Sequence, residues 1–223
     1  MPALSDIAID GPVASGKTVV GRSLAHCLGY RFVDTGNMYR AVTWAALERD
    51  IDPQNEAHLS SLAAALSFEV VPGREGEERL LVDGQDVTDW LREPSVENWV
   101  SAVSAVAEVR RALVSAQRNM AKQGGVVMVG RDIGTVVLPD AKLKVFLTAS
   151  PEERAQRRYL ELQGSGKPAE YGQVLKELQQ RDETDSQRAA SPLRPAEDAR
   201  ILDTSGLNVD EVVDRIVSLM ESL

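Results

Sequence analysis

Cysteine is almost absent from this chain of 223 residues, since Cys27 is the only one. No internal disulfide is therefore possible, and this thiol, which falls in a predicted helix, is expected to be buried and inert. A lone cysteine suits a reducing compartment, and no apolar run approaches the length of a membrane span. The first residues also lack the charged-then-apolar pattern of a secretion signal. These absences predict a cytoplasmic protein with no membrane partner.

Positive charge is also in short supply. The chain has 25 Lys and Arg residues against 34 Asp and Glu residues, and its net charge is −9. A surface of this sign repels polyanions, so nucleic acid is not an expected partner. If an acidic protein such as this one binds an anion, its basic residues must lie in local clusters. The sequence has no internal repeat and no exposed heptad seam, so a monomer is expected.

The most informative residues are Gly11 to Thr18, which form the motif G-x-x-x-x-G-K-T of a phosphate-binding loop. A strand-like apolar run at 7–10 precedes the motif and a helical pattern at 19–28 follows it, as the motif requires. Lys17 is expected to reach the β- and γ-phosphates of ATP, and the Thr18 hydroxyl to bind Mg²⁺. The alternative is a glycine-rich turn that happens to carry a lysine, which the flanking strand and helix argue against. The residues expected to bind ATP are Gly11, Pro12, Val13, Ala14, Ser15, Gly16, Lys17, Thr18 and Val19.

Strands and helices alternate along most of the chain. This pattern predicts an α/β fold in which a central parallel sheet is flanked by helices. The run from Gly125 to Gly130 is continuously apolar, as a buried parallel strand is. The other predicted strands of this sheet are 7–10, 30–34, 143–147 and 200–203. Helices are predicted at 19–28, 38–49 and 209–223.

One stretch interrupts the alternation. Apolar runs at 68–71, 79–82 and 85–87 predict short antiparallel strands, and the Asp83-Gly84 pair between the last two is a strong hairpin signal. Helical patterns at 56–66 and 96–123 flank these strands. We therefore expect an inserted subdomain at about 55–105.

Two polar clusters follow predicted strands of the parallel sheet. The run Asp34 to Arg40 follows the second strand, and Arg131 and Asp132 follow the strand that ends at Gly130. Ligands of open α/β sheets bind at this edge. Arg40 lies in the first turn of a predicted helix, which favours a bound anion nearby. The alternatives are a helix cap for Thr35 and a local ion pair for Arg131 and Asp132.

Two groups of arginines lie on either side of the helix-breaking link 164–168. The first group is Arg154, Arg157 and Arg158, on a helix that Ser150 and Pro151 are expected to begin. The second is Arg181 and Arg188 with Asp185, spaced to share one helical face. Asp185 could also simply pair with both arginines on a solvated face. Two such helices around a turn predict a lid that closes over a nucleotide. The expected segments are a core of 1–54, 106–150 and 190–223, the insertion at about 55–105, and the lid at about 151–189.

These motifs together resemble the bacterial cytidylate kinases. The matching residues run in order over almost the whole chain, and the most specific is Gly-Arg-Asp-Ile-Gly-Thr-Val-Val at 130–137. The family often has Ser where Thr35 stands, and its loop often reads Gly-Lys-Gly-Thr or Gly-Lys-Ser-Thr. Here the hydroxyl of Thr18 directly follows Lys17, which is the usual place for a Mg²⁺-binding hydroxyl.

The resemblance implies Mg²⁺-dependent transfer of the γ-phosphoryl group of ATP to CMP or dCMP, giving ADP and CDP or dCDP. It implies that Lys17, Arg131, Arg154 and Arg158 carry catalysis, and that Arg157 lies on the nucleotide. The implied acceptor-binding residues are Thr35, Arg40, Ser101, Arg110, Arg131, Asp132, Arg181, Asp185 and Arg188. Within this set, Ser101, Arg110 and Asp132 would read the cytosine.

One geometric difficulty accompanies this assignment. Ser101 and Arg110 are nine residues apart, so they lie on opposite faces of an unbroken helix. No proline or glycine between residues 104 and 108 would force a break.

Two other classes of function stay open. One is a different small-molecule P-loop kinase, acting on UMP, dephospho-coenzyme A or shikimate, and the insertion and second arginine group argue against it. The other is a nucleotide-sensing protein without transfer activity, against which the intact Lys17, Thr18 and lid arginines argue. The Asn-Lys-x-Asp motif of guanine-reading GTPases is missing from the sequence.

Overall fold

The computed structural model describes residues 5–73, 77–188 and 190–222. The chain divides into two compact units. Residues 1–32 and 124–223 form one, which we call the loop unit because it carries the phosphate-binding motif. Residues 33–123 form the other, the inserted unit.

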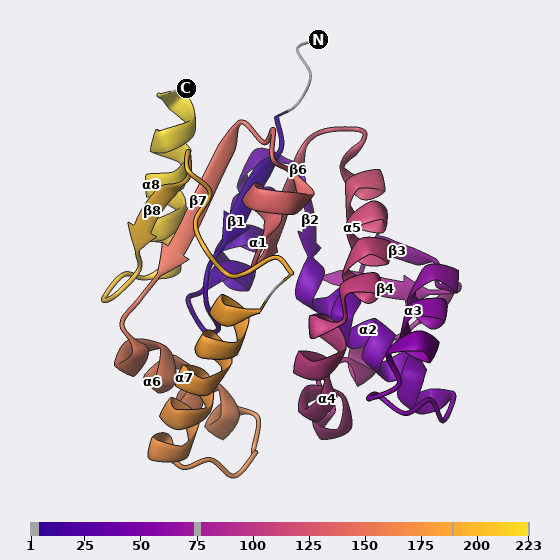
Figure 1. Ribbon diagram of the computed structural model, residues 1–223. Helices are drawn as coiled ribbons and strands as arrows, with labels where there is room; N and C mark the ends of the chain where they lie inside the picture. The colour runs from indigo at the N-terminus through magenta and orange to yellow at the C-terminus, as the bar shows by residue number, and fades with distance from the viewer. Residues whose placement is uncertain (1–4, 74–76, 189, 223) are drawn as a thin grey trace. The chain divides into compact units, whose positions relative to one another are not determined.

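The main sheet has five strands in the order β2-β6-β1-β7-β8. The strand β1 (Ile7–Asp10) lies at the centre and pairs in parallel with β6 (Val126–Gly130) and β7 (Leu143–Thr148). The outer strands are β2 (Arg31–Asp34) and β8 (Arg200–Asp203), and β8 runs parallel to β7. Helices cover this sheet, so the predicted α/β class is confirmed (Figure 1).

Two helices of the loop unit share a core with the sheet. The helix α1 (Lys17–Leu28) packs against β6 and against α8 (Val209–Glu221). Val20 and Leu24 of α1 and Ile216 of α8 are buried in that core. Because the last two residues of the phosphate motif are the first two of α1, this packing fixes the start of the helix at the carboxyl end of β1.

The helices α6 (Pro151–Gly164) and α7 (Tyr171–Gln187) form a helical hairpin, seen at the bottom left of Figure 1. Ser150 caps α6 by accepting a hydrogen bond from the Glu153 N–H at 3.2 Å, and Pro151 occupies the first helical position, as predicted. The apolar contact between the helices is small, with Ala155, Val174 and Leu178 as its buried residues.

The inserted unit contains four helices and a three-stranded antiparallel sheet among its described residues. The strands are β3 (Phe68–Pro72), β4 (Glu78–Val82) and β5 (Gln85–Asp86), and the antiparallel pairing was predicted. Asp83 and Gly84 connect β4 to β5 with φ angles of 50° and 82°, as in a type I′ turn. A 3₁₀ turn, η2 (Thr88–Trp90), follows.

The inserted unit is wider than the segment 55–105 suggested by the sequence, because two more helices share its core. These are α2 (Thr35–Glu48) and α5 (Ala107–Ala121), and the remaining two are α3 (Glu56–Ala65) and α4 (Pro94–Ala105). Val42 of α2, Leu59 of α3 and Leu113 of α5 are completely buried in one apolar cluster. A sequence pattern shows that a helix is amphipathic but not which partner covers its apolar face.

The single helix predicted for 96–123 is wrong, since the chain breaks at Val106. This residue has extended backbone angles, φ −68° and ψ 118°, between α4 and α5. Val100 and Val109 are nine residues apart, about half a turn out of phase on an unbroken helix. Both are buried in the same cluster, which requires the phase to be reset between them. Core packing therefore forces the break without proline or glycine.

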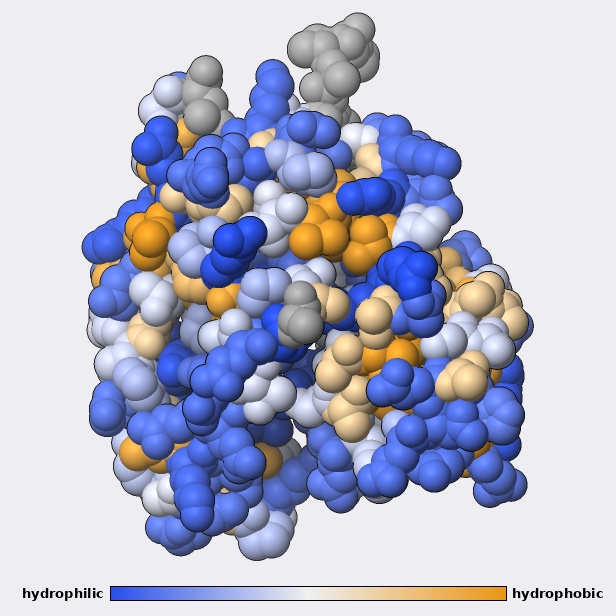
Figure 2. Space-filling view, viewed as in Figure 1, coloured by the Kyte–Doolittle hydropathy of each residue, from blue (hydrophilic) through white to orange (hydrophobic). Residues whose placement is uncertain are grey.

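The surface of the chain is mostly polar on the face that is drawn in Figure 2. The face shown in Figure 2 is mostly hydrophilic, with apolar residues in small groups. Within the described ranges, none of the helices combines the length and apolar character needed to cross a bilayer. Cys27 is exposed, contrary to the expectation of a buried thiol, because it lies in the last turn of α1 beyond the buried Leu24 and Ala25.

Candidate active site

The phosphate motif forms a tight loop between β1 and α1. Ala14 and Gly16 have positive φ angles of 57° and 91°. Gly11 tolerates no side chain, since a Cβ there would lie 2.1 Å from the Leu147 carbonyl oxygen, and its φ is 150°. These conformations curl the backbone around the N-terminus of α1, where N–H groups lack helical partners and favour an anion.

Lys17 is turned into this loop. Its side chain is buried, with 7% of the residue exposed, and its ammonium donates to the Pro12 carbonyl at 2.5 Å and to Ser15 Oγ at 3.3 Å. A buried cation is stabilised most by an opposite charge. The loop is therefore preorganised for an anion such as a phosphate.

Asp10, the last residue of β1, is also buried, with 4% exposed. Its two carboxylate oxygens accept hydrogen bonds from the N–H groups of Ile133 and Gly134, each at 2.8 Å. Burial raises the pKa of Asp10 to about 6, and the nearby Asp132 adds to that rise. The two backbone hydrogen bonds and Lys17 act in the opposite direction.

Arg131 follows β6 and links the loop to α7. Its guanidinium donates to the Gly11 carbonyl at 2.9 Å and to Asp185 Oδ2 at 2.8 Å. Asp185 is 8% exposed and also pairs with Arg188 at 3.5 Å, so the alternative of a solvated helical face is wrong. Burial raises the pKa of Asp185, but Arg131, Arg188 and Arg181 outweigh it, and the pKa lies below its ordinary value. Arg188 lies just beyond the end of α7, with extended backbone.

The three arginines of α6 have different environments. Arg154 is 4% exposed, donates to the Val13 carbonyl of the phosphate loop at 3.1 Å, and pairs with Asp182 of α7 at 2.7 Å. Arg157 reaches the loop after β8 and donates to the Thr204 carbonyl at 2.6 Å. Arg158 pairs with Glu161 near the surface at 2.8 Å. Their mutual repulsion is therefore offset by carboxylates of the protein.

The donor set fits Mg²⁺ bound mainly through a nucleotide. Thr18 is the second residue of α1 and offers one hydroxyl oxygen, a hard ligand of the type that Mg²⁺ prefers. Over the described ranges, no group of three or more His, Cys, Asp or Glu residues could hold a metal ion. Mg²⁺ in kinases is typically held by one or two protein oxygens together with phosphates and water, which matches this arrangement.

Four predicted residues lie in the inserted unit. Thr35 is buried in the first turn of α2, but the cap is Asp34, whose carboxylate accepts the Gly36 N–H at 2.9 Å. The capping role suggested for Thr35 is therefore wrong. Arg40 donates through Nε to Glu97 of α4 at 2.9 Å.

The break at Val106 removes the geometric difficulty with Ser101 and Arg110. The Arg110 guanidinium is buried, lies 5.2 Å from the centre of the Tyr39 ring, and donates to the Ser104 carbonyl at 3.0 Å. The Ser104 hydroxyl in turn donates to the Ser101 carbonyl at 3.0 Å. Ser104, which lies between the two predicted residues, is thus hydrogen-bonded to both.

Sequence reasoning missed three residues that hold the predicted ones. Glu97 and Asp182 pair with Arg40 and Arg154, and no local pattern signals these long-range pairs. Thr204 is 2% exposed, and its hydroxyl contacts the Arg157 guanidinium at 3.0 Å and the Ser15 carbonyl at 3.3 Å. Its position directly after a strand of the parallel sheet was a usable signal.

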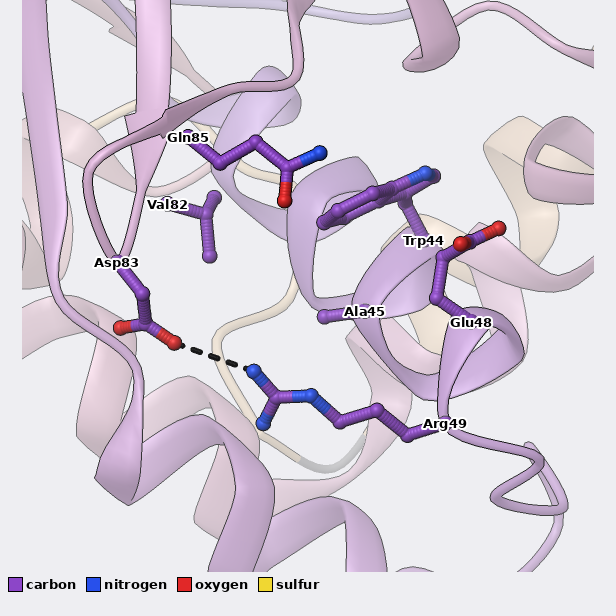
Figure 3. A pocket seen from close by; sticks show the side chains of 7 residues that line it. All are labelled: Trp44, Ala45, Glu48, Arg49, Val82, Asp83 and Gln85. Carbon is purple, nitrogen blue, oxygen red and sulfur yellow. Dashed lines mark hydrogen bonds and ion pairs between the residues drawn. The ribbon is translucent and has the colours of Figure 1, made fainter.

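A cavity of about 200 Å³ lies elsewhere in the inserted unit (Figure 3). Trp44 of α2 and Arg49, which directly follows that helix, border it, opposite the β4–β5 turn. Arg49 pairs with Asp83 at 3.1 Å across one side. None of the predicted site residues lines this cavity. It is thus separate from the chemistry that the motifs indicate.

The phosphate loop at the end of β1, the parallel sheet and the arginines of α6 and α7 define a P-loop kinase. The family model described as cytidylate kinase matches residues 7–222. A cytidylate kinase of Desulfitobacterium hafniense is 50% identical over 213 residues, 96% of this chain and 91% of that protein. One from Pelotomaculum thermopropionicum is 50% identical over 218 residues, 98% of this chain and 96% of that protein. The chain belongs to the cytidylate kinase family.

A solved structure agrees on the fold alone. An uncharacterized protein from Eubacterium ventriosum has a TM-score of 0.54 at 16% identity, over 98% of this chain and 99% of that one. At this identity the match says nothing about the acceptor.

Proposed function

We propose that this chain transfers the γ-phosphoryl group of ATP to CMP or dCMP, giving ADP and CDP or dCDP. The single observation that carries the proposal is the buried Lys17 inside a preorganised phosphate loop, in a chain that belongs to the cytidylate kinase family. The loop residues 11–19 would hold the donor phosphates, with Arg157 on the donor nucleotide. Mg²⁺, held with the Thr18 hydroxyl, would neutralise charge on the transferring group.

The acceptor is assigned to the residues that the resemblance to the family implies. Arg131, Arg181, Asp185 and Arg188 of the loop unit are proposed to bind its sugar and phosphate, with Thr35 and Arg40 of the inserted unit on its phosphate side. Asp132, Ser101 and Arg110 are proposed to read the cytosine. The pairs Arg40–Glu97 and Arg131–Asp185 support these roles, because each guanidinium is already oriented by a carboxylate before an anion arrives.

The segment at about 55–105, within the unit 33–123, is proposed to be the acceptor-binding subdomain, and about 151–189 the lid. Within the described residues, α6 and α7 pack chiefly against each other and little against other elements, which supports a mobile role for the pair. Closing such a lid would exclude water, and Arg154 and Arg158 would then stabilise charge on the transferring group.

No strong base is needed for this reaction. The acceptor's phosphate oxygen is already an anion and can attack the γ-phosphorus in line with the departing ADP oxygen. The work of the protein is positioning and charge stabilisation by Lys17, Arg131 and the lid arginines.

Composition supports the remaining proposals on setting. A net charge of −9 argues against nucleic acid as a partner, and the single, exposed cysteine suits a reducing cytoplasm. A monomer is proposed, and sedimentation velocity at several concentrations would test it.

The decisive experiment is an ADP-release assay with ATP, Mg²⁺ and CMP, dCMP, UMP or AMP offered separately. Fast turnover with CMP and dCMP is the expected result. If only UMP or AMP were phosphorylated, the assignment of CMP and dCMP as substrates would be wrong. ATP binding without any turnover would point to a sensing protein.

A further inference from the structure

Asp10 has no role in the reaction as described so far, yet it is among the most buried charged residues of the loop unit. Both carboxylate oxygens are occupied, one by the Ile133 N–H and the other by the Gly134 N–H. These two N–H groups belong to the first residues of a π-helical turn, η3 (Ile133–Val137). The start of such a turn has donors without helical partners, and Asp10 satisfies two of them.

The turn directly follows Arg131 and Asp132, two of the residues assigned to the acceptor. The Asp132 carbonyl accepts hydrogen bonds from Val136 at 2.8 Å and Val137 at 3.1 Å, so its backbone is part of the same turn. Gly134 is closely packed, since a Cβ there would lie 3.1 Å from Lys144 Cδ and 3.4 Å from Asp10 Oδ2. Asp10 therefore packs closely against the turn that it holds, and the backbone at Gly134 has little room to move.

A further hydrogen bond joins the residues that follow β1 and β6. Gly11, the next residue, accepts the Arg131 guanidinium on its carbonyl at 2.9 Å. The two strands pair in parallel, with Asp10 opposite Gly130. Asp10 and Gly11, which lead into the phosphate loop, thus hold the backbone of Ile133 and Gly134 and the side chain of Arg131.

We propose that Asp10 is a positioning residue that couples the two halves of the site: its carboxylate sets the backbone of residues 131–134, and thereby where Arg131 and Asp132 meet the acceptor. This inference rests on the proposed function for its acceptor. Asp10 itself touches neither nucleotide in this role. Its loss should weaken use of the acceptor more than binding of ATP.

The charges around Asp10 supply a spectroscopic signature. Asp132 and Lys17 are the charged groups that act on it, and the Lys144 ammonium is drawn away to Asp198 at 2.8 Å. A carboxyl that is buried between these groups titrates near pH 6. The backbone N–H groups of Ile133 and Gly134 should report that titration directly, since hydrogen bonds to a charged acceptor are stronger than those to a neutral one.

The test combines kinetics of Asp10→Asn with NMR of the wild-type chain. An amide in place of the carboxylate turns one acceptor into a donor that faces an N–H group. The expected result is a KM for CMP raised about tenfold, with a KM for ATP changed less than twofold. In the wild type, the N–H resonances of Ile133 and Gly134 should shift with a midpoint near pH 6.

The chain offers a matched control in Asp6→Asn. Asp6 also accepts a backbone N–H from β6, that of Val126 at 3.3 Å, but at the opposite end of β1. We expect both KM values of this variant to match the wild type. Equal effects of the two substitutions, or an unchanged KM for CMP in Asp10→Asn, would overturn the proposal.

The two possible failures are distinguishable. If the wild type does not use CMP, the proposed function fails, while the NMR titration still reports whether Asp10 holds the turn. Were Asp10→Asn to unfold, the wild-type titration would decide alone, and N–H groups of Ile133 and Gly134 that ignore pH between 5 and 7 would refute the role.

Discussion

The phosphate loop and the arginines on and around α6 and α7 hold their charges by different means. We call the second group the arginine cluster: Arg131, Arg154, Arg157, Arg158, Arg181 and Arg188. In the loop, one cation is fixed by oxygens two and five residues away, Ser15 and Pro12. In the cluster, Arg131 is fixed by Asp185 and Arg154 by Asp182, across separate elements. The loop therefore holds its cation with oxygens that are close by in the sequence. The cluster forms only when its separate elements are folded together, so its charges are tied to stability as well as to their proposed role in catalysis.

This comparison predicts that the largest loss of activity without loss of fold comes from the loop. We expect Lys17→Ala to lower kcat by about 10² to 10³, the cost of removing one preorganised donor from a charged transition state. Its unfolding midpoint should change less, because the Lys17 ammonium donates hydrogen bonds to two oxygens of its own loop, and its charge interaction is the smallest of those that set the pKa of Asp10. Steady-state kinetics and thermal unfolding measure the two quantities.

Lys122→Ala is the control for Lys17→Ala, since Lys122 is exposed at the end of α5. We expect this variant to behave as the wild type. Near-normal turnover of Lys17→Ala would contradict the proposed catalytic role.

The same contrast explains what the sequence could predict. The phosphate loop, the main strands and the Asp83-Gly84 turn depend on neighbours in the chain, and local patterns predicted them correctly. The break at Val106 depends on a shared core. The pairs Arg40–Glu97 and Arg154–Asp182 likewise depend on elements that meet only in the fold. The sequence showed where the arginines lie along the chain, but not which carboxylates pair with them.

Breaking the cluster at its most buried arginine should cost stability. Arg154→Ala would leave Asp182 without this partner and the Val13 and Ala149 carbonyls without a donor. Removing one member of a buried pair costs about 3 kcal/mol, which lowers the unfolding midpoint of a chain this size by about 6 to 12 °C. Thermal and urea unfolding measure this loss. A midpoint within 2 °C of the wild type would mean that solvent replaces the pair freely.

The two buried carboxylates should respond to pH in opposite directions. The pKa of Asp10 is raised from 3.8 to about 6, so its contribution to stability is present below pH 3.8 and is lost as the pH rises through 6. The size of that loss is about 3 kcal/mol. The pKa of Asp185 is lowered, so its contribution is present above pH 3.8 and is lost as the pH falls through its folded value.

Urea unfolding between pH 3 and pH 7 separates the two carboxylates. Relative to the wild type, Asp10→Asn should gain stability as the pH rises from 4 to 6, and Asp185→Asn should lose stability as the pH rises from below 4. Parallel curves for wild type and Asp10→Asn would show that Asp10 titrates normally.

The smallest effect should come from the cluster's exposed pair. Arg158 and Glu161 are three residues apart on α6, and about a quarter of the Arg158 side chain is exposed against 61% for Glu161. Pairs of this kind contribute less than about 1 kcal/mol, so Arg158→Ala should unfold within about 3 °C of the wild type. If Arg158 stabilises the transferring group, kcat should still fall by about tenfold, since that role concerns the transition state alone. A normal kcat in Arg158→Ala would contradict this role for Arg158. Arg154, the buried one of the two proposed lid arginines, would then remain as the candidate for stabilising the transferring group.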